Sequence, residues 1–393
     1  MLAVFQPAKF QSMGVSQEIH VLKGRIAFLF KAGREARVAD GGPTEFFYGY
    51  VQLRQKGYDA EIVTDRELDL DTLPARVWRS VSHMFYAATG VPLWPIARLA
   101  RSTTVARLNA FDCLVVSTNT FGVCLGLLCR LNVIQTPVLF LAIGLIEPTT
   151  PARVVRIYRW IFGKRVSVCA LTEGNARLLS SKLDAPIGHI PFGVDTSFWT
   201  PAGAAPAGDY VLSIGNDSHR DYATLLRAWR PSDPRLRVVT SHPISSTAAN
   251  VEIIRGGWHH QVLTDEAIRT LVQNARFVIL PIRETIQPSG QSACLQAMAC
   301  AKTVVITDFS GLWNRELLRD GDTCLFSGAP GDHDGIRRAV DRLAADSSES
   351  ARIGANARRM VESALSVEHM AAAVAREVAE CITSAAPHSP RAN

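Results

Sequence analysis

Short apolar runs alternate with amphipathic segments along most of the chain, and this alternation is the feature that most constrains the fold. The first run, RIAFLF at Arg25–Phe30, is typical of a strand buried on both faces of a parallel sheet. Thr44–Lys56 then has helical spacing of its apolar residues, with Pro43 before it and Gly57 after it. Ala60–Val63 is the next apolar run. This order predicts the βαβ unit of a doubly wound α/β sheet.

The alternation comes in two series, separated by Pro191–Pro206, which is rich in Pro and Gly and has no clear periodicity. Further strands are expected at Cys113–Ser117, Val138–Ile143, Val166–Leu171, Tyr210–Ile214, Leu236–Thr240, Val251–Ile254, Phe277–Leu280 and Val304–Thr307. We therefore expect an α/β protein with two Rossmann-like domains, residues 1–195 and 196–365, facing each other across a cleft. Residues 366–383 predict a helix that can cross back to the first domain, and residues 384–393 a disordered tail.

Basic residues are concentrated in the first domain. Residues 1–195 hold 22 Lys/Arg against 15 Asp/Glu, and the remainder holds 20 against 21. Two stretches, Arg76–Arg101 and Arg153–Arg165, interleave basic with aromatic residues, which suits an anionic membrane surface. The alternative is a solvated basic face whose aromatic residues pack inward.

The eight cysteines form no CxxC pair and sit mostly in apolar runs, which indicates small buried thiols in a reducing compartment. The chain begins without the basic start and apolar stretch of a leader, and its apolar runs are shorter than the ~20 residues of a spanning helix. We expect a cytoplasmic protein, able to bind peripherally at the inner face of the membrane. The sequence has no zinc-site spacing and no nucleic-acid-binding motif, so neither a metal nor a nucleic-acid partner is expected.

Ligands of open α/β sheets bind outside the carboxyl ends of the strands, and four loops at such ends carry candidate site residues. Gly41 and Gly42 precede the first long helix, where a backbone without side chains can approach an anion; a plain turn is the alternative. The loop Gly215–Asp221 contains Arg220 at a helix start, where a cation opposes the helix dipole. This placement makes sense if the guanidinium binds a diphosphate; the alternative is a surface pair with Asp217.

The other two loops follow the strand at Phe277–Leu280. Ser289, Gly290 and Gln291 open the helix SACLQAMAC, and their amides can bind phosphate oxygens. Gln296 within this helix needs a hydrogen-bond partner if it is buried, either a ribose hydroxyl or a group of the core. Glu284 is the carboxylate candidate for the reacting sugar, or else an ordinary loop glutamate.

Three segments, in the correct order, resemble glycosyltransferase family 4. IPFGVDTSFWTP is similar to the family's interdomain PxGVDxxxFxP segment, and YVLSIGNDSHRDYATLLRAW to its second-domain glycine and basic element. PSGQSACLQAMACAKTVVITDFSGLWNRELLRDGDTCLF resembles the block that carries EAMA and a DG turn. The resemblance implies a GT-B fold and a retaining, metal-independent transfer from a UDP- or GDP-sugar. The implied acceptor is a glycan, a lipid-linked molecule or another molecule, bound by the first domain, in cell-envelope polysaccharide or glycolipid biosynthesis.

By position, the resemblance implies which residues bind the phosphates or the ribose of the donor. These residues are Gly41, Gly42, Gly215, Asn216, Arg220, Ser289, Gly290, Gln291 and Gln296. Several positions depart from the family. Gln296 replaces the second of two glutamates, Pro288 stands at the first, and Asn216 replaces an arginine. Glu284 can substitute for the missing first glutamate as the catalytic carboxylate. These departures keep two alternatives open, a nucleotide-sugar epimerase of GT-B type and a non-catalytic GT-B subunit, whereas no GxGxxG motif supports an NAD(P)-dependent enzyme.

Overall fold

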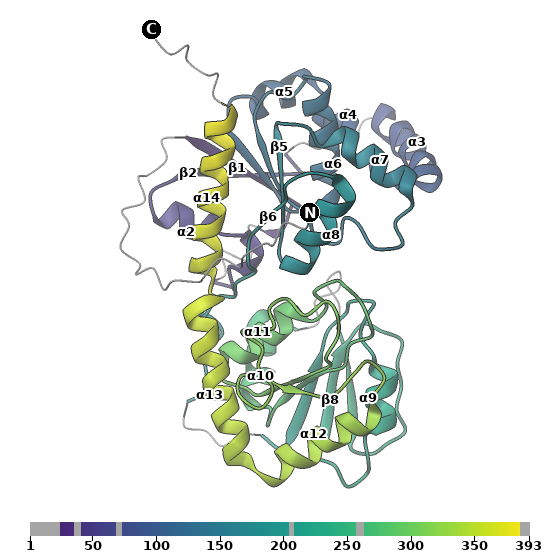
Figure 1. Ribbon diagram of the computed structural model, residues 1–393, viewed down its shortest axis with the longest axis vertical. Coiled ribbons are helices and arrows are strands. Elements are labelled where there is room, and N and C mark those ends of the chain that lie inside the picture. The colour runs from purple at the N-terminus through teal and green to yellow at the C-terminus, as the bar shows by residue number, and fades with distance from the viewer. Residues whose placement is uncertain (1–23, 35–40, 68–72, 204–207, 257–262, 386–393) are drawn as a thin grey trace, which may run out of the picture.

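The computed structural model describes residues 24–34, 41–67, 73–203, 208–256 and 263–385, and builds them into two parallel sheets of six strands each (Figure 1). The first sheet has the order β2-β1-β3-β4-β5-β6. Its strands are β1 (Arg25–Phe30), β2 (Asp59–Thr64), β3 (Cys113–Val116), β4 (Val138–Leu141), β5 (Val166–Ala170) and β6 (Gly188–His189). Its helices are η1 (Glu45–Phe47), α2 (Tyr50–Gln55), α3 (Leu73–Thr89), α4 (Ile96–Leu99), α5 (Ser102–Leu108), α6 (Asn119–Arg130), α7 (Ala152–Ile161) and α8 (Glu173–Leu183).

The second sheet has the order β12-β11-β10-β7-β8-β9. Its strands are β7 (Tyr210–Ile214), β8 (Arg235–Thr240), β9 (Val251–Arg255), β10 (Val278–Leu280), β11 (Val304–Ile306) and β12 (Leu325–Phe326). The helices that follow β7 are α9 (Tyr222–Ala228), α10 (Asp265–Asn274), α11 (Gln291–Ala299), α12 (His333–Ala345), α13 (Ser347–Ala364) and α14 (Val367–Ala385). The central strands are buried along their whole length, as in β3, β4, β10 and β11, because helices cover both faces. The expected α/β class with two Rossmann-like sheets is confirmed.

The helix expected over Thr44–Lys56 is interrupted. The chain forms η1, turns through Tyr48 (φ 49°) and Gly49 (φ 85°), and only then begins α2. A Cβ built on Gly49 would lie 2.8 Å from the Cα of Ala371 in α14. The interruption therefore has a tertiary cause: the turn brings the backbone against the last helix, a contact that a sequence pattern cannot reveal.

The chain passes between the sheets twice, and the two passages are hydrogen-bonded to each other. The amide of Val194 donates to Leu365 O at 2.9 Å, and the amide of Val367 donates to Val194 O at 3.0 Å. After the second passage, α14 packs against α2, β3 and β4 of the first sheet (Figure 1). The last helix thus belongs to the first sheet's layer although it follows the whole second sheet in sequence.

All eight cysteines are free and buried, as expected. Helix α14 extends through Ala385, two residues into the expected tail, and residues 386–393 lie outside the described part of the chain. Within the described ranges, no helix combines the length and the apolar character that a membrane span requires.

Candidate functional site

The loops after β7 and β10 meet because these strands are neighbours, with Leu212 paired to Val278. Parallel neighbours end at the same edge of a sheet, so Gly215–Asp221 and Pro281–Gln291 lie together. Two backbone bonds join the loops: Asp221 N donates to Pro281 O at 2.9 Å, and Arg283 N donates to His219 O at 2.8 Å. The two donor loops that the sequence predicted are therefore adjacent.

Arg220 lies between these loops and is 4% exposed. A Cβ on Gly215 would lie 2.3 Å from Arg220 Nε, and a Cβ on Gly290 would lie 3.1 Å from Arg220 Nη1. Both glycines have positive φ (152° and 78°), so the absence of a side chain at each makes room for the guanidinium. The structure brings Arg220 beside the turn that opens α11.

The guanidinium is only partly satisfied. Arg220 Nε forms an ion pair with Asp217 Oδ2 at 2.7 Å without hydrogen-bond geometry, and Nη1 has no hydrogen-bond partner within the described ranges. Asp217 also accepts a hydrogen bond from Ser289 Oγ, which links the two loops through one carboxylate. The alternative pairing of Arg220 with Asp217 is thus present, with a buried guanidinium and an Asp217 side chain that is 36% exposed. A buried guanidinium with an unused donor is suited to an anion.

The turn that opens α11 differs from the expected phosphate cradle. Ser289 N donates to Gln287 O at 2.7 Å, and Gln291 N donates to Pro288 O at 3.2 Å. Two of the three predicted amides are therefore engaged inside the turn. Gly290 is the N-cap residue of α11 and has left-handed backbone geometry. The N-terminus of α11, which is the positive end of the helix dipole, still lies beside the guanidinium of Arg220.

Asn216 and Glu284 face other partners. Asn216 Oδ1 accepts hydrogen bonds from Ser241 N at 2.6 Å and Thr240 Oγ1 at 3.3 Å, so its side chain holds the loop after β8. The exposed Glu284 accepts from Ser310 N at 3.3 Å and so contacts the loop after β11. The structure describes no contact of either side chain with Arg220, and their donor-binding and catalytic roles stay predictions.

Gln296 has a protein partner in the position where a ribose was expected. Its Nε2 donates at 2.8 Å to Oε1 of Glu45, which belongs to η1 of the first domain. The alternative left open by the sequence, a glutamine satisfied by the core, is the one that the structure contains. The amide is used in a contact between the two domains, and its role at a ribose stays a prediction.

Glu45 is fully buried, and its neighbourhood was missed from the sequence. Trp199 Nε1 donates to the same Oε1 at 2.9 Å, and Asp195 N donates to Oε2 at 3.4 Å. Burial raises the pKa of Glu45 to about 7, against the lowering effect of the hydrogen bonds from Gln296 and Trp199, while nearby Asp195 raises it further. A carboxylate directly before the aromatic run FFYGY was the available signal, since a buried charge requires hydrogen-bond partners.

Gly41 and Gly42 lie just before Glu45. Gly41 is exposed and has φ 71°, and a Cβ built on it would meet no atom within 4 Å. The nearby Thr44 is fixed to the interdomain segment, since its Oγ1 donates to Asp195 Oδ2 at 2.7 Å. The glycine pair thus directly precedes a stretch that is tied to the interdomain segment, and its role at the donor phosphates stays a prediction.

A second polar contact between the domains was also missed. Asn175, at the start of α8, donates from Nδ2 to Gln287 Oε1 at 3.4 Å. Buried Asn175 Oδ1 and Gln287 Nε2 have no partner within the described part of the chain, and the same is true of Asn119 Oδ1. Asn119 Nδ2 donates to Ile143 O, beside Gly144, which itself lies against Gln287. Neutral amides therefore line the first-domain side of the contact.

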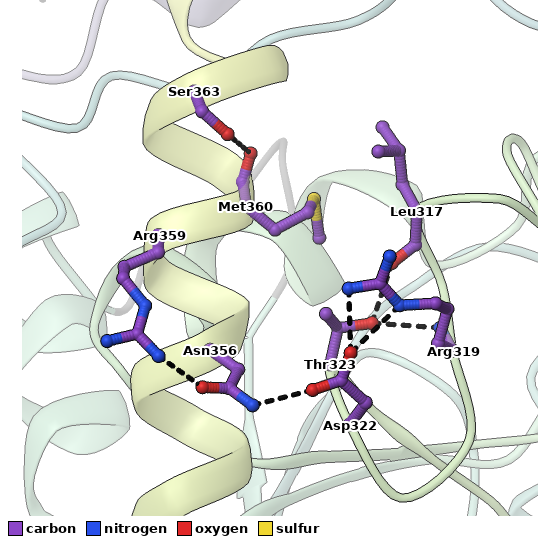
Figure 2. A pocket seen from close by; sticks show the side chains of 8 residues that line it. All are labelled: Leu317, Arg319, Asp322, Thr323, Asn356, Arg359, Met360 and Ser363. Carbon is purple, nitrogen blue, oxygen red and sulfur yellow. Dashed lines mark hydrogen bonds and ion pairs between the residues drawn. The ribbon is translucent and has the colours of Figure 1, made fainter.

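A pocket of about 490 Å³ lies elsewhere, between α13 and the loop 317–323 (Figure 2). Its polar side chains bond to one another: Arg319 pairs with Asp322 at 2.7 Å, and Asn356 Nδ2 donates to Asp322 Oδ1 at 2.6 Å. Because these side chains form hydrogen bonds and ion pairs with one another, we interpret them as a structural network and not as a ligand site. In the described ranges, no group of three His, Cys, Asp or Glu side chains is placed to hold a metal ion.

Comparison with known proteins agrees with the two-sheet fold. Residues 210–346 match the family model described as glycosyl transferases group 1. The structure of Anabaena Alr3699/HepE in complex with UDP and glucose superposes with a TM-score of 0.63 at 13% identity, over 91% of this chain and 99% of that one. Sucrose-phosphate synthase from Thermosynechococcus elongatus gives a TM-score of 0.63 at 15% identity, over 92% and 99%. The chain has the GT-B fold.

A curated relative adds sequence similarity to this GT-B fold. α-Maltose-1-phosphate synthase of Mycobacterium tuberculosis is 26% identical over 217 residues, which are 48% of this chain and 56% of the relative. The chain thus spans about half the length of the curated relatives it matches. The match of residues 210–346 to the glycosyl transferases group 1 model supports a transferase enzyme.

Proposed function

We propose that this GT-B protein transfers a sugar from a nucleotide-sugar donor to an acceptor bound by its first domain. The observation that carries the proposal is Arg220, a buried cation whose Nη1 lacks a partner in the described chain, at the N-terminus of α11. A diphosphate is the anion that suits this place, because a guanidinium and a helix N-terminus both favour phosphate oxygens.

The proposed donor is a UDP-sugar, with a GDP-sugar as the other option. Support comes from the neighbouring Anabaena structures, which were solved with UDP and with UDP-glucose. We further propose that the chain belongs to family 4, that transfer proceeds with retention, and that no metal is used. The motif resemblance supports these finer assignments.

In the proposed reaction, the bond between the sugar carbon and the diphosphate breaks, and the diphosphate leaves with increased negative charge. Arg220 and the α11 dipole stabilise this charge without moving, because the glycine-lined position already holds the guanidinium in place. The oxygen of the acceptor hydroxyl forms the new bond to the sugar carbon, and the leaving phosphate accepts the proton of that hydroxyl. Glu284 contributes a carboxylate near the sugar when the donor is bound.

The proposed acceptor is a glycan, a lipid-linked molecule or another hydroxyl compound, bound against Asn119 and Asn175. Their buried amide oxygens have no partner within the described chain, so hydroxyl groups of an acceptor could satisfy them when the domains separate. A role in cell-envelope polysaccharide or glycolipid synthesis, at the cytoplasmic face of a membrane, is consistent with the basic first domain.

Release of nucleotide from a panel of UDP-, GDP- and ADP-sugars tests the proposal. We expect release with one donor class, and a loss on the order of 100-fold in Arg220→Gln. Arg283→Gln is the matched control, because Arg283 lies in the adjoining loop with 57% of its side chain exposed. Formation of an epimer without nucleotide release would instead establish an epimerase. If the protein binds no donor and releases no nucleotide, it is a non-catalytic subunit.

A further inference from the structure

Within the described part of the chain, the large exposed apolar side chains belong to one stretch of the first domain. The large hydrophobic residues that are exposed in the described chain all fall within residues 81–160: Val81, Met84, Phe85, Tyr86, Leu131 and Trp160. Met84 is 75% exposed and Trp160 is 50% exposed. Apolar groups that gather in one region of a surface mark an interaction site, whereas scattered ones need no explanation.

Helix α3 presents four of these residues and projects from the body of the first domain (Figure 1). Val81, Met84 and Phe85 have i, i+3, i+4 spacing and therefore share one face of the helix. Ser82 is buried, whereas the residues from His83 to Ala88 are exposed. The side chains of Arg76, Trp78 and Arg79 lie outside the described part. The described half of α3 thus keeps its apolar face away from the protein.

Helix α7 supplies the charge. Arg153, Arg156 and Trp160 lie on its exposed face, opposite the buried Val154 and Ile161. Neither Arg153 nor Arg156 forms an ion pair within the described ranges. Trp160 in turn lies under the guanidinium of Arg130, 5.6 Å from ring centroid to Cζ.

The two helices are neighbours. Gly90, directly after α3, lies against Val154 of α7, where a Cβ would be 3.5 Å from Val154 Cγ2. Burial raises the pKa of the Tyr158 phenol to about 12, and the nearby Tyr86 of α3 raises it further. We define the docking face as Val81, Met84, Phe85 and Tyr86 of α3, Arg153, Arg156 and Trp160 of α7, and the adjoining Arg130 and Leu131.

The charge around the docking face is one-sided. Residues 73–172 contain 11 Lys/Arg and only two acidic residues, Asp112 and Glu147, a net charge of +9 within a chain of net charge +6. A protein partner of ordinary composition would not require such an excess, whereas an anionic bilayer attracts basic residues and accepts aromatic and aliphatic side chains beneath its headgroups.

We propose that the docking face binds the surface of an anionic lipid membrane, with α3 lying in the interface and the arginines of α7 on the headgroups. Helix α7 begins directly after the loop 142–151, whose Gly144 lies against Gln287 at the contact between the domains. The docked membrane would therefore lie on the acceptor side of the first domain. This placement rests on the proposed function, but binding to the membrane does not.

Flotation of the full chain with vesicles tests the inference. We expect binding to mixed phosphatidylcholine–phosphatidylglycerol vesicles, no binding to phosphatidylcholine alone, and weakening as salt is raised. Arg153→Glu/Arg156→Glu should weaken binding by at least about tenfold, because each arginine contributes roughly fivefold near such a surface. Met84→Ser/Phe85→Ser should also weaken binding by at least about tenfold, because it removes the apolar side chains that lie beneath the headgroups. Arg227→Glu/Arg376→Glu, an equal charge change at positions outside the docking face, should bind nearly as the wild type.

Three outcomes would overturn the inference: equal binding to neutral vesicles, unchanged binding in both docking-face variants, or equal loss in the control variant. A dimer that Met84→Ser/Phe85→Ser dissolves, without vesicle binding, would assign the face to a second copy of the chain. Thermal unfolding of each variant checks its fold. Nucleotide release from free donor is measured in parallel, and should be unchanged by the docking-face variants, so failure of membrane binding is distinguishable from failure of the proposed transfer.

Discussion

Gln296 of α11 donates from Nε2 to Oε1 of Glu45 at 2.8 Å, although the two residues are 251 positions apart and belong to different domains. The amide at position 296 is complementary to the buried carboxylate, because it supplies an N–H where a glutamate would supply a second acceptor. The glutamine at this position, where the family that the sequence resembles has a glutamate, therefore has a local physical partner. It also makes the domain contact depend on the ionisation of Glu45.

Gln296→Glu is expected to destabilise the protein by about 2 kcal/mol, because a donated hydrogen bond is replaced by two facing carboxylates. Urea denaturation above pH 7 measures the change. The exchanged pair Glu45→Gln/Gln296→Glu is the control, since it restores one amide and one carboxylate and should recover most of the loss. Equal stability of Gln296→Glu and the wild type would show that the contact contributes nothing.

The pKa of Glu45 predicts a pH dependence of stability. Folding raises this pKa from 4.5 to about 7, so between these values the folded protein holds a proton that the unfolded chain releases. The stabilisation is complete below 4.5 and is lost as the pH rises through about 7, by at most about 3 kcal/mol. Unfolding free energies measured at both ends of this window should differ less in Glu45→Gln than in the wild type. An identical slope in both proteins would contradict the assignment.

Gly290→Ala tests the fit of Arg220 without removing a polar group. The new Cβ would lie 3.1 Å from Arg220 Nη1 and 3.3 Å from Ile282 Cδ1, so the guanidinium must shift. We expect UDP binding, measured by calorimetry, to weaken by about tenfold, as for the loss of one charged hydrogen bond. Gly57→Ala is the matched control, because Gly57 has a similar φ (85° against 78°) and no atom within 4 Å. Equal UDP affinity in the two variants would show that the contact between Gly290 and Arg220 does not contribute to UDP binding.

Arg358→Ala is expected to loosen the attachment of the interdomain segment Pro191–Pro206 to α13 and α11. Arg358 of α13 donates from Nη1 to Trp199 O at 2.6 Å and from Nη2 to Thr196 O at 3.0 Å, and also bonds to Ala299 O. Loss of these charged donors should lower the free energy of unfolding by about 2 kcal/mol. Arg359→Ala, on the exposed side of the same helix, should change it little. Chemical denaturation compares the two, and similar losses would show that α13 itself, not this contact, is affected.

Much of the fold follows from local patterns. Arg25–Phe30 and Tyr210–Ile214 are strands with the expected bounds, because buried parallel strands are short, apolar and flanked by turn residues. The break at Tyr48–Gly49 could not be predicted, since it depends on the approach of Ala371. In the same way, the placement of Arg220 beside Gly290 follows from strand order, whereas the partners of Asn216 and Gln296 depend on which loops face them.

The sequence by itself determined the two α/β units, the loops in which polar residues gather, and the excess of positive charge in the first of the units. It could do so because periodicity, turn chemistry and charge are properties of neighbouring residues. The tertiary structure alone decided that Glu45 meets Gln296 and Trp199, that Arg220 is buried with an unused donor, and that α3 and α7 form one surface. These relationships join residues far apart in the chain, and only the packing of the domains fixes the distances between them.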